Sequence, residues 1–415
     1  MIFKASGDGS CSCGRVHSMT TTFAIVEGGA LKRVSEYIKE SGISGYAVAI
    51  YDENTYAAAG ELRPKADKEI ILSPEGLHAD EHGVASAKAG MPEKCDYLIA
   101  VGSGTVHDIT RYIAHEMGVP FVSCPTAASV DGFCSSVAAM TWQGFKKTFT
   151  AVAPTLVVAD TSVISKAPMR LTRAGFGDMI GKYIALSDWR IANILTGEYL
   201  CEEIYKLTLD ATEAVLSSAS GIVEGKMEAY EKLTYGLLMS GIAMQMLGNS
   251  RCASGAEHHI SHLIEMRPEG LSLSSDALHG EKVGVGTLIA SREYHRLMAS
   301  GMLGTRDYEP ASEDYIISAF GKVIGESVVK ENEVDSCATI TKEMLTAAKD
   351  KIKAVVDVIP TPEELIGVYN MLGVLSSLSD IDVSDDMVDA LLEYSPLVRN
   401  RLTLMRLRRS TLGRR

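Results

Sequence analysis

The histidines of the sequence gather in one short stretch. Four of the ten lie between residues 258 and 279. His258 and His262 are four residues apart, which places them on one face of a helix, and His279 follows after a loop. Two imidazoles from separate elements, joined by a carboxylate from elsewhere, form a three-ligand metal site with an open position. A catalytic metal needs that open position because the substrate oxygen binds there.

The best candidate for the carboxylate is Asp178, because Gly175 and Gly177 precede it and allow other groups to approach closely. One aspartate and two histidines suit zinc, nickel or iron, and the affinity order alone does not select among them. The alternative is that these histidines are ordinary core or surface residues. Their density within this stretch makes that alternative the weaker one.

A second chemical signal lies where a predicted strand enters a helix. The apolar run 97–101 leads directly into Gly102-Ser-Gly-Thr-Val-His-Asp108. Glycines allow a sharp turn, and the helix N-terminus offers unpaired N–H groups to a phosphate. The dinucleotide-binding fingerprint would have a third glycine where His107 stands. A tight strand-to-helix turn without a ligand therefore remains open.

Two further segments are expected to lie near that turn. The loop Pro125–Gly132 follows the next strand, and its small, hydroxyl-bearing residues predict a lining for the same crevice at the carboxyl edge of the sheet. Asp52 ends the apolar run 46–51, where an acidic residue commonly holds the ribose hydroxyls of NAD. A role for Asp52 as a turn former is nearly as well supported.

The N-terminal segment resembles a metal knuckle. Cys11, Cys13 and His17 supply three possible ligands, with no cysteine or histidine nearby to complete four. A structural zinc site is one interpretation of this segment, and the sequence leaves its role open.

The elements that must position these residues change in type along the chain. Residues 46–51, 97–101, 119–123 and 156–159 are short, continuously apolar runs, typical of parallel strands covered on both faces. Helical patterns at 31–38 and 105–117 alternate with them. The alternation predicts a Rossmann-like, doubly wound α/β domain over residues 1–165. Only helical patterns follow, which predicts an all-α domain over residues 166–415 for metal and substrate binding.

Composition limits the possible functions. The 415 residues contain 53 Asp and Glu against 40 Lys and Arg, a net charge of −13, with 6% aromatic residues. This balance argues against a protein that coats nucleic acid, although it leaves a phosphorylated substrate possible. The eight scattered cysteines are expected to be reduced thiols in the cytoplasm. Neither a signal peptide nor a membrane span is expected, and the arginine-rich segment 399–415 is interpreted as a solvated end of a final helix.

Five motifs, in order, resemble the bacterial sn-glycerol-1-phosphate dehydrogenases, from the metal-dependent superfamily of glycerol dehydrogenase and dehydroquinate synthase. The resemblance runs from about residue 22 to residue 300. The motifs are Gly102–Asp108, Pro125–Gly132, Gly175–Asp178, Ser254–His262 and His279–Gly286. The resemblance implies the dehydroquinate synthase-like fold, NAD or NADP as cofactor and a divalent metal. It also implies a homodimer or larger homo-oligomer.

Residue by residue, the resemblance implies three sets of contacts. The metal ligands would be Asp178, His258 and His279. Asp131, Asp178 and His262 would contact the substrate. The cofactor contacts would be Gly104, Thr105, Val106, His107 and Asp108 at the pyrophosphate, and Thr126, Ala127, Ala128, Ser129 and Ser135 near the nicotinamide. Gly102 at the turn and Asp52 at the ribose are added from their positions in the sequence.

Two arginines bear on this resemblance. Arg111 stands where relatives often carry lysine, a difference expected to affect only helix packing. Arg251 precedes the histidine cluster and is the candidate that would hold a phosphate, because a forked guanidinium suits a phosphate dianion. A surface arginine without such a role is an equal alternative.

The predicted reaction is reversible hydride transfer between NAD(P)H and dihydroxyacetone phosphate, giving sn-glycerol 1-phosphate for phospholipid or glycerophosphate metabolism. His262 is expected to relay the proton. Three alternatives stay open. They are a glycerol dehydrogenase acting on unphosphorylated glycerol, a dehydroquinate-synthase-like lyase, and a nucleotide-binding protein that has lost catalysis.

Overall fold

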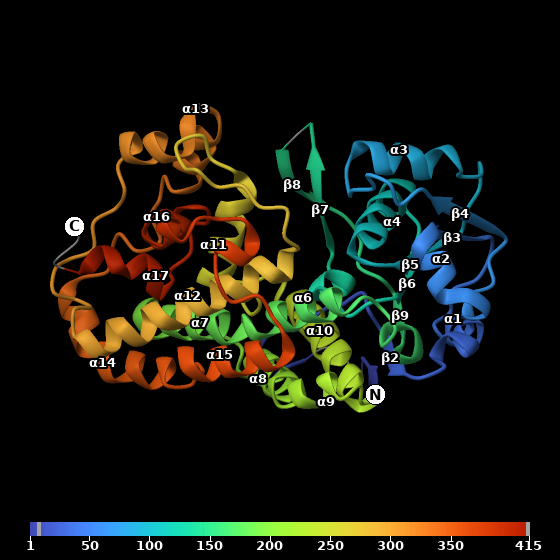
Figure 1. Ribbon diagram of the computed structural model, residues 1–415, viewed down its shortest axis with the longest axis horizontal. Coiled ribbons are helices and arrows are strands. Elements are labelled where there is room, and N and C mark those ends of the chain that lie inside the picture. Colours follow the sequence, from blue (N-terminus) through green and yellow to red (C-terminus); the bar gives the residue numbers. More distant parts are fainter. Residues whose placement is uncertain (6–9, 144, 412–415) are drawn as a thin grey trace. The chain divides into compact units, whose positions relative to one another are not determined.

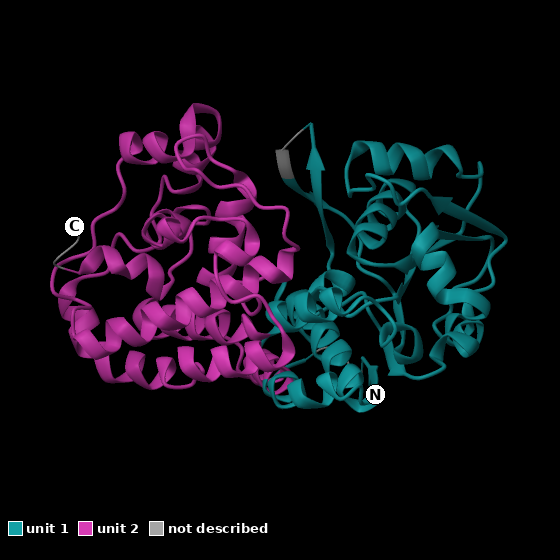
Figure 2. Ribbon diagram, in the orientation of Figure 1, with its two compact units in different colours: residues 1–179, 213–249 teal, residues 180–212, 250–415 magenta. Residues whose placement is uncertain are grey.

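The computed structural model describes residues 1–5, 10–143 and 145–411 (Figure 1). They form two compact units (Figure 2): unit 1 comprises residues 1–179 and 213–249, and unit 2 comprises residues 180–212 and 250–415. The chain passes between the units three times, and helices α6 (Met169–Ile180) and α8 (Glu202–Ser217) each continue across a boundary. The division into residues 1–165 and 166–415 follows secondary structure type instead and stays a proposal about domains.

Unit 1 contains a seven-stranded sheet in the order β1-β2-β9-β6-β5-β3-β4. Every neighbouring pair is parallel except β1 with β2. The strands are β1 (Ile2–Lys4), β2 (Phe23–Glu27), β3 (Ala47–Asp52), β4 (Lys68–Leu72), β5 (Tyr97–Gly102), β6 (Phe121–Pro125) and β9 (Leu156–Asp160). The four predicted strands are β3, β5, β6 and β9, and they are confirmed.

Helices cover both faces of this sheet, as continuously apolar strands require. Alternate residues of β3 and β5 point to opposite sides: Ala49 and Ile99 pack with α1 (Val34–Glu40), whereas Val48 and Leu98 pack with α3 (Glu81–Ala89) and α4 (Gly104–Met117). Helix α2 (Glu53–Ala59) also follows β3. The predicted doubly wound α/β architecture is therefore confirmed.

A separate hairpin, β7 (Val137–Trp142) with β8 (Phe145–Thr150), was not expected from the sequence, and neither were β1, β2 and β4. Unit 1 also holds α5 (Thr161–Ile164), α9 (Ala219–Val223) and α10 (Met227–Leu247). Helix α10 contacts the short 3-10 helix η3 (Asp131–Cys134) that follows the loop after β6. This contact determines the surroundings of Asp131.

Among the described residues of unit 2, the regular elements are all helices, as predicted, and loops connect them. Helix α11 packs against α12, and α7 packs against both α11 and α14. The helices are α7 (Lys182–Thr196), α11 (Ala256–Met266), α12 (His279–Ser300), α13 (Glu313–Glu331), α14 (Lys342–Val356), α15 (Pro362–Leu372), α16 (Val388–Tyr394) and α17 (Leu404–Leu407). Among the described residues, no helix is both long and apolar enough to cross a bilayer.

The arginine-rich C-terminal segment corrects one prediction. It is not a solvated helix end, because α17 has four residues and the Arg406 side chain is fully buried. Its guanidinium pairs with Asp335 at 2.8 Å and donates to the carbonyl of Pro396. A buried charge needs such partners, so this arginine joins separate parts of unit 2. The last two arginines of the segment lie outside the described residues.

Candidate functional site: a cofactor turn in unit 1 and a histidine cluster in unit 2

The turn from β5 into α4 lies at the carboxyl edge of the sheet. It is tight: a Cβ added at Gly102 would lie 2.7 Å from the Val106 side chain, so glycine is required there. Ser103 is the N-cap residue of α4, but its side chain makes no hydrogen bond to the helix. The first-turn N–H groups of α4 therefore receive no hydrogen bond from the Ser103 side chain, and they suit an anion such as a pyrophosphate.

His107 supports this turn from the inside. Its ring is 1% exposed, with Nδ1 2.9 Å from the Ser103 carbonyl and Nε2 2.8 Å from the Ser123 hydroxyl. The carbonyl can only accept, so Nδ1 carries the hydrogen and the hydroxyl donates to Nε2. Burial, together with the Arg111 charge, lowers the pKa of His107 to about 3. The neutral ring thus joins α4 to β6, and its side chain faces the protein core.

The other predicted cofactor residues lie along the same sheet edge. Thr126, Ala127, Ala128 and Ser129 are buried in the loop after β6, and the Thr126 N–H donates to the Gly102 carbonyl. On the opposite side of β5, Ile50 of β3 pairs with Ala100, which brings Asp52 level with Gly102 two residues further on. One carboxylate oxygen of Asp52 caps α2 by accepting from Thr55 at 2.8 Å.

Three more predicted residues have defined partners. The Ser135 hydroxyl donates to the Val137 carbonyl at 2.9 Å. Asp108 lies 3.6 Å from Arg111, whose guanidinium donates to the carbonyls of Phe133 and Val137. Arg111 therefore joins α4 to η3 and β7, which is the packing role that the sequence predicts for it.

Asp131 and Asp178 lie together within unit 1. The Asp131 N–H donates to the fully buried Asp178 carboxylate at 3.0 Å, and the Asp131 side chain accepts from Ser240 at 2.8 Å. Helix α6 can carry Asp178 to this place because Gly175 lies against the loop: a Cβ there would meet the Ala128 carbonyl oxygen at 2.1 Å. Gly175 thus permits the close approach of α6 to this loop that the sequence predicts.

Unit 2 brings three predicted histidines together. The ring centroids of His258 and His279 are 5.3 Å apart, and each lies 6.0 Å from that of His262. His258 and His262 come from α11, and His279 is the first residue of α12. His259 is fully buried in the same helix. The spacing of four residues and the loop before His279 therefore produce the expected cluster.

Each of two imidazoles is held by a carboxylate that sequence reasoning missed. Nδ1 of His258 lies 2.6 Å from the buried Glu257, and Nδ1 of His279 lies 3.1 Å from Glu265. Burial alone would raise the pKa of Glu265, but the charges of His279 and Lys282 hold it well below its usual range. A carboxylate at Nδ1 fixes the ring and leaves Nε2 as the ligating nitrogen, as in many metal sites. The signal in the sequence was proximity: Glu257 adjoins His258, and Glu265 follows His262 by one helical turn.

The environment of His262 favours its uncharged form. Burial lowers the pKa of His262 to about 3, and the neighbouring Glu265 opposes the shift only in part. One ligand atom each from His262, Glu265 and His279 lies within 4.8 Å of the others. A neutral imidazole in this cluster can accept a proton on one nitrogen and donate from the other.

Arg251 is not a surface residue, because it is 4% exposed. Its Nε donates to Glu198 at 2.8 Å and its Nη2 donates to the Leu402 carbonyl at 2.6 Å. Sequence reasoning missed its neighbour Arg401, which donates to Ser250 and to the Ser254 carbonyl. Burial and the charges of Arg251 and Arg399 lower the pKa of Arg401 to about 10. Unit 2 thus holds a basic cluster of three arginines close to the helix that carries the histidines.

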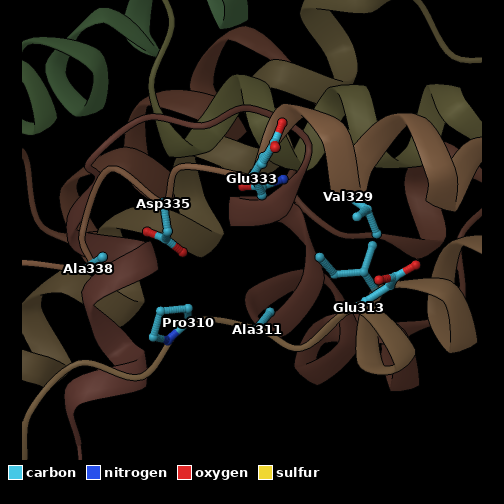
Figure 3. A pocket seen from close by; sticks show the side chains of 9 residues that line it. Pro310, Ala311, Glu313, Val329, Glu333, Asp335 and Ala338 are labelled. Atoms are coloured by element: carbon cyan, nitrogen blue, oxygen red, sulfur yellow. The ribbon is translucent and has the colours of Figure 1, made fainter.

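A pocket elsewhere in unit 2 contains none of the predicted site residues (Figure 3). It lies between the start of α13 and the segment after that helix, and Glu313, Glu333 and Asp335 are among the residues that line it. Three carboxylates disfavour a phosphorylated ligand. This pocket is therefore separate in chemistry from the histidine and arginine clusters.

Comparison with known proteins identifies the family. The family model described as "Iron-containing alcohol dehydrogenase" matches residues 25–168. Glycerol-1-phosphate dehydrogenase (NAD(P)+) of Bacillus licheniformis is 32% identical over 406 residues, covering 95% of this chain and 90% of the relative. The enzyme of the same name from Halalkalibacterium halodurans is 32% identical, covering 95% and 94%. The chain belongs to the glycerol-1-phosphate dehydrogenase family.

Membership of the glycerol-1-phosphate dehydrogenase family confirms the resemblance inferred from the five motifs. The fold agrees with it as well. The crystal structure of a probable glycerol dehydrogenase from Sinorhizobium meliloti 1021 matches with a TM-score of 0.61 at 20% identity, covering 94% of this chain and 95% of that chain. That likeness confirms the fold, an α/β sheet followed by a helical region.

Proposed function

We propose that this protein interconverts dihydroxyacetone phosphate and sn-glycerol 1-phosphate with NAD or NADP and one divalent metal ion. The observation that carries the proposal is the pair of carboxylate-held imidazoles on α11 and α12 in a chain of this family. The relatives named for this activity align with this chain over almost their whole length. A phosphorylated three-carbon substrate also fits the basic cluster formed by Arg251, Arg399 and Arg401.

The residues proposed to hold the metal are Asp178, His258 and His279. Their chemistry fits a divalent ion: one carboxylate, and two imidazoles whose Nδ1 positions are occupied by Glu257 and Glu265. Asp178 lies four residues before α7 begins, and α7 packs against the helix that carries His258. When bound, the ion would act as a Lewis acid toward the ketone oxygen, which is worth several kcal/mol. Zinc, nickel and iron all suit these donors.

The cofactor is proposed to bind at the β5–α4 turn. The N–H groups from Gly104 to Asp108 would hold the pyrophosphate, with the His107 ring keeping the turn in place from below. Thr126, Ala127, Ala128, Ser129 and Ser135 would adjoin the nicotinamide. Asp52 would offer a carboxylate oxygen to the ribose while the other caps α2. When bound there, the cofactor would supply or accept the hydride.

His262 and Asp131 are proposed to handle the proton and the substrate hydroxyl groups. His262 is neutral at physiological pH, so it can pass a proton to the C2 oxygen from one ring nitrogen and recover one at the other. Asp131 is oriented by the Ser240 hydroxyl and by its own N–H bond to Asp178. Its carboxylate would accept a hydrogen bond from a substrate hydroxyl.

The substrate phosphate is proposed to bind at the arginine cluster. Arg251 already pairs with Glu198. The positive charge of Arg401 is repelled by two other guanidinium groups, those of Arg251 and Arg399. A phosphate dianion would relieve that repulsion, because each arginine would gain an opposite charge. Arg401 therefore joins Arg251 as a residue for phosphate recognition.

The reaction is tested by NADH or NADPH oxidation with dihydroxyacetone phosphate, followed by chiral identification of the product. The expected result is net cofactor oxidation and sn-glycerol 1-phosphate, with loss of turnover after chelation and recovery on adding metal. Equal efficiency with unphosphorylated dihydroxyacetone would favour a glycerol dehydrogenase. No net cofactor oxidation would favour a lyase or a protein without catalysis.

Substitution of the arginines separates the phosphate proposal from a purely structural role. Arg401→Gln should raise KM for dihydroxyacetone phosphate about tenfold or more while changing kcat little, because a charge-assisted hydrogen bond is worth about 1.5–3 kcal/mol. KM for unphosphorylated dihydroxyacetone should not change. Arg251→Gln should show the same split, and an equal loss with both ketones would contradict phosphate recognition by that residue.

Cytoplasmic location and assembly as a homodimer or larger homo-oligomer are part of the same proposal. Eight cysteines without paired spacing are typical of a reducing compartment. The family to which the chain belongs supports an oligomer, which light scattering of the purified protein would test.

A further inference from the structure

The N-terminal segment of unit 1 forms a tight loop that the proposed reaction does not use. Ser10 and Val16 pair as an antiparallel bridge, and the Gly14 N–H donates to the Cys11 carbonyl at 3.0 Å. Gly14 has a φ of +81°, which closes the turn. Within residues 10–17, the side chains that are at least partly buried are those of Cys11, Cys13 and His17. Val16, the one aliphatic residue in this range, is 70% exposed, so the loop has no apolar core of its own.

The contacts of His17 select one of its ring nitrogens. Nδ1 lies 2.8 Å from the Met246 carbonyl, and Nε2 lies 3.3 Å from Sγ of Cys13. A carbonyl only accepts, so Nδ1 carries the hydrogen and Nε2 directs a lone pair toward the cysteine. Histidines that bind metals usually donate their other N–H to a carbonyl or carboxylate in this way.

The loop is also held to the rest of unit 1. Gln245, next to Met246 at the end of α10, accepts from the Thr20 and Thr21 N–H groups at 2.9 and 3.2 Å. Its amide also donates to the Thr21 hydroxyl. The chain leaving His17 is thereby attached to the same helix end that orients the imidazole. Cys13 and His17 are pre-positioned before any ion binds.

We propose that Cys11, Cys13 and His17 of unit 1 bind a zinc ion, since one ligand atom from each lies within 4.8 Å of the others. Two thiolates and one imidazole supply three ligands of a tetrahedral site, and the thiols release their protons on binding. Zn–S and Zn–N bonds of about 2.3 and 2.0 Å at a tetrahedral angle place sulfur and nitrogen roughly 3.5 Å apart. The observed separation of Cys13 and His17 is 3.3 Å.

Ligand type separates this site from the proposed catalytic one. Soft thiolates select zinc over magnesium or manganese. The catalytic ligands Asp178, His258 and His279 include no sulfur. Spectroscopy that detects metal–thiolate bonds therefore reports on the N-terminal site alone.

The test uses full-length protein with Co²⁺ in place of its native metals. Wild-type protein should show the near-ultraviolet thiolate-to-cobalt charge-transfer band, and His258→Ala should keep it while losing turnover. Cys11→Ser and Cys13→Ser should each lose most of the band. Cys95→Ser is the matched control, because this buried thiol donates to the Tyr97 carbonyl in unit 1, and it should retain the band.

Absence of the band from wild-type protein would overturn the zinc site, whatever the variants do. A band unchanged in Cys13→Ser would also overturn it, and one unchanged in Cys11→Ser would remove Cys11 from the ligand set. In the His258→Ala background, which should lack the catalytic metal, His17→Cys keeps a ligand and should retain one zinc per chain by metal analysis, whereas His17→Ala should bind it more weakly. None of these outcomes bears on the proposed dehydrogenase reaction, because that reaction is tested separately by turnover with the phosphorylated ketone.

Discussion

Two regions of the molecule hold their histidine rings in opposite ways. In the β5–α4 turn of unit 1, both ring nitrogens of His107 bond to the protein, one to a carbonyl and one to a hydroxyl. On α11 and α12 of unit 2, a carboxylate holds Nδ1 of His258 and of His279. The partner of each ring nitrogen, more than burial, therefore separates a structural histidine from a candidate ligand.

The largest effect is expected from removing a proposed ligand. His258→Ala should lose bound catalytic metal and lower kcat/KM by about 1000-fold or more, since Lewis-acid activation is worth several kcal/mol. Metal analysis and steady-state kinetics measure the two losses. His115→Ala, at an exposed position on α4, is the control and should keep both. Full activity in His258→Ala with metal still bound would show that His258 is not a ligand of the catalytic metal.

A smaller effect is expected from the carboxylates that hold the rings. Glu265→Gln and Glu257→Gln should each weaken metal binding by about 10–100-fold, because outer-shell partners tune ligand orientation and basicity. Turnover at saturating metal should fall much less than affinity. Competition with a chelator measures the affinity, and Glu269→Gln, an exposed position just beyond α11, is the matched control. Unchanged affinity in both variants would show that the carboxylates have no role in binding.

His107 should show its structural role as a pH dependence of stability. Below about pH 6.5 the unfolded chain gains a proton on this residue, whereas the folded ring stays neutral until about pH 3. Stability is therefore lost as pH falls, by about 2 kcal/mol between pH 6.5 and pH 5. His107→Asn should remove this part of the loss.

Denaturant unfolding at both pH values measures the effect in unit 1. The protein has two tryptophans, so Trp189→Phe leaves Trp142 of unit 1 as the fluorescent reporter. His115→Asn, at an exposed site, should behave like the parent. An equal acid-side loss in His107→Asn and the parent would contradict the assignment of a neutral, buried ring.

The sequence was sufficient to predict strands with continuous apolar runs and functional residues that lie close together in the chain. Continuous apolar runs predicted β3, β5, β6 and β9, and a spacing of four predicted that His258 and His262 share a face. Patterning could not predict β1, a three-residue strand without buried side chains, or β4, which alternates in burial at the sheet edge.

Partners far apart in the sequence also escaped prediction. Nothing near Arg406 indicates that it pairs with Asp335, and nothing near Arg251 indicates Glu198. Arg406 was expected to be solvated, and a surface position was one of two equal alternatives for Arg251, because charged residues usually lie at the surface. The folded chain instead supplies acceptors to both from distant segments. His107 was predicted from its motif position, but the direction of its ring depends on Ser123 in another strand.

The most direct test of the central claim is a crystal structure of the metal-loaded protein, with anomalous scattering recorded at the absorption edge of its catalytic metal. We expect an ion bound by the Asp178 carboxylate and by Nε2 of His258 and His279, with Glu257 and Glu265 still at Nδ1. An ion bound through Nδ1, or placed away from Asp178, would contradict this assignment of the ligands.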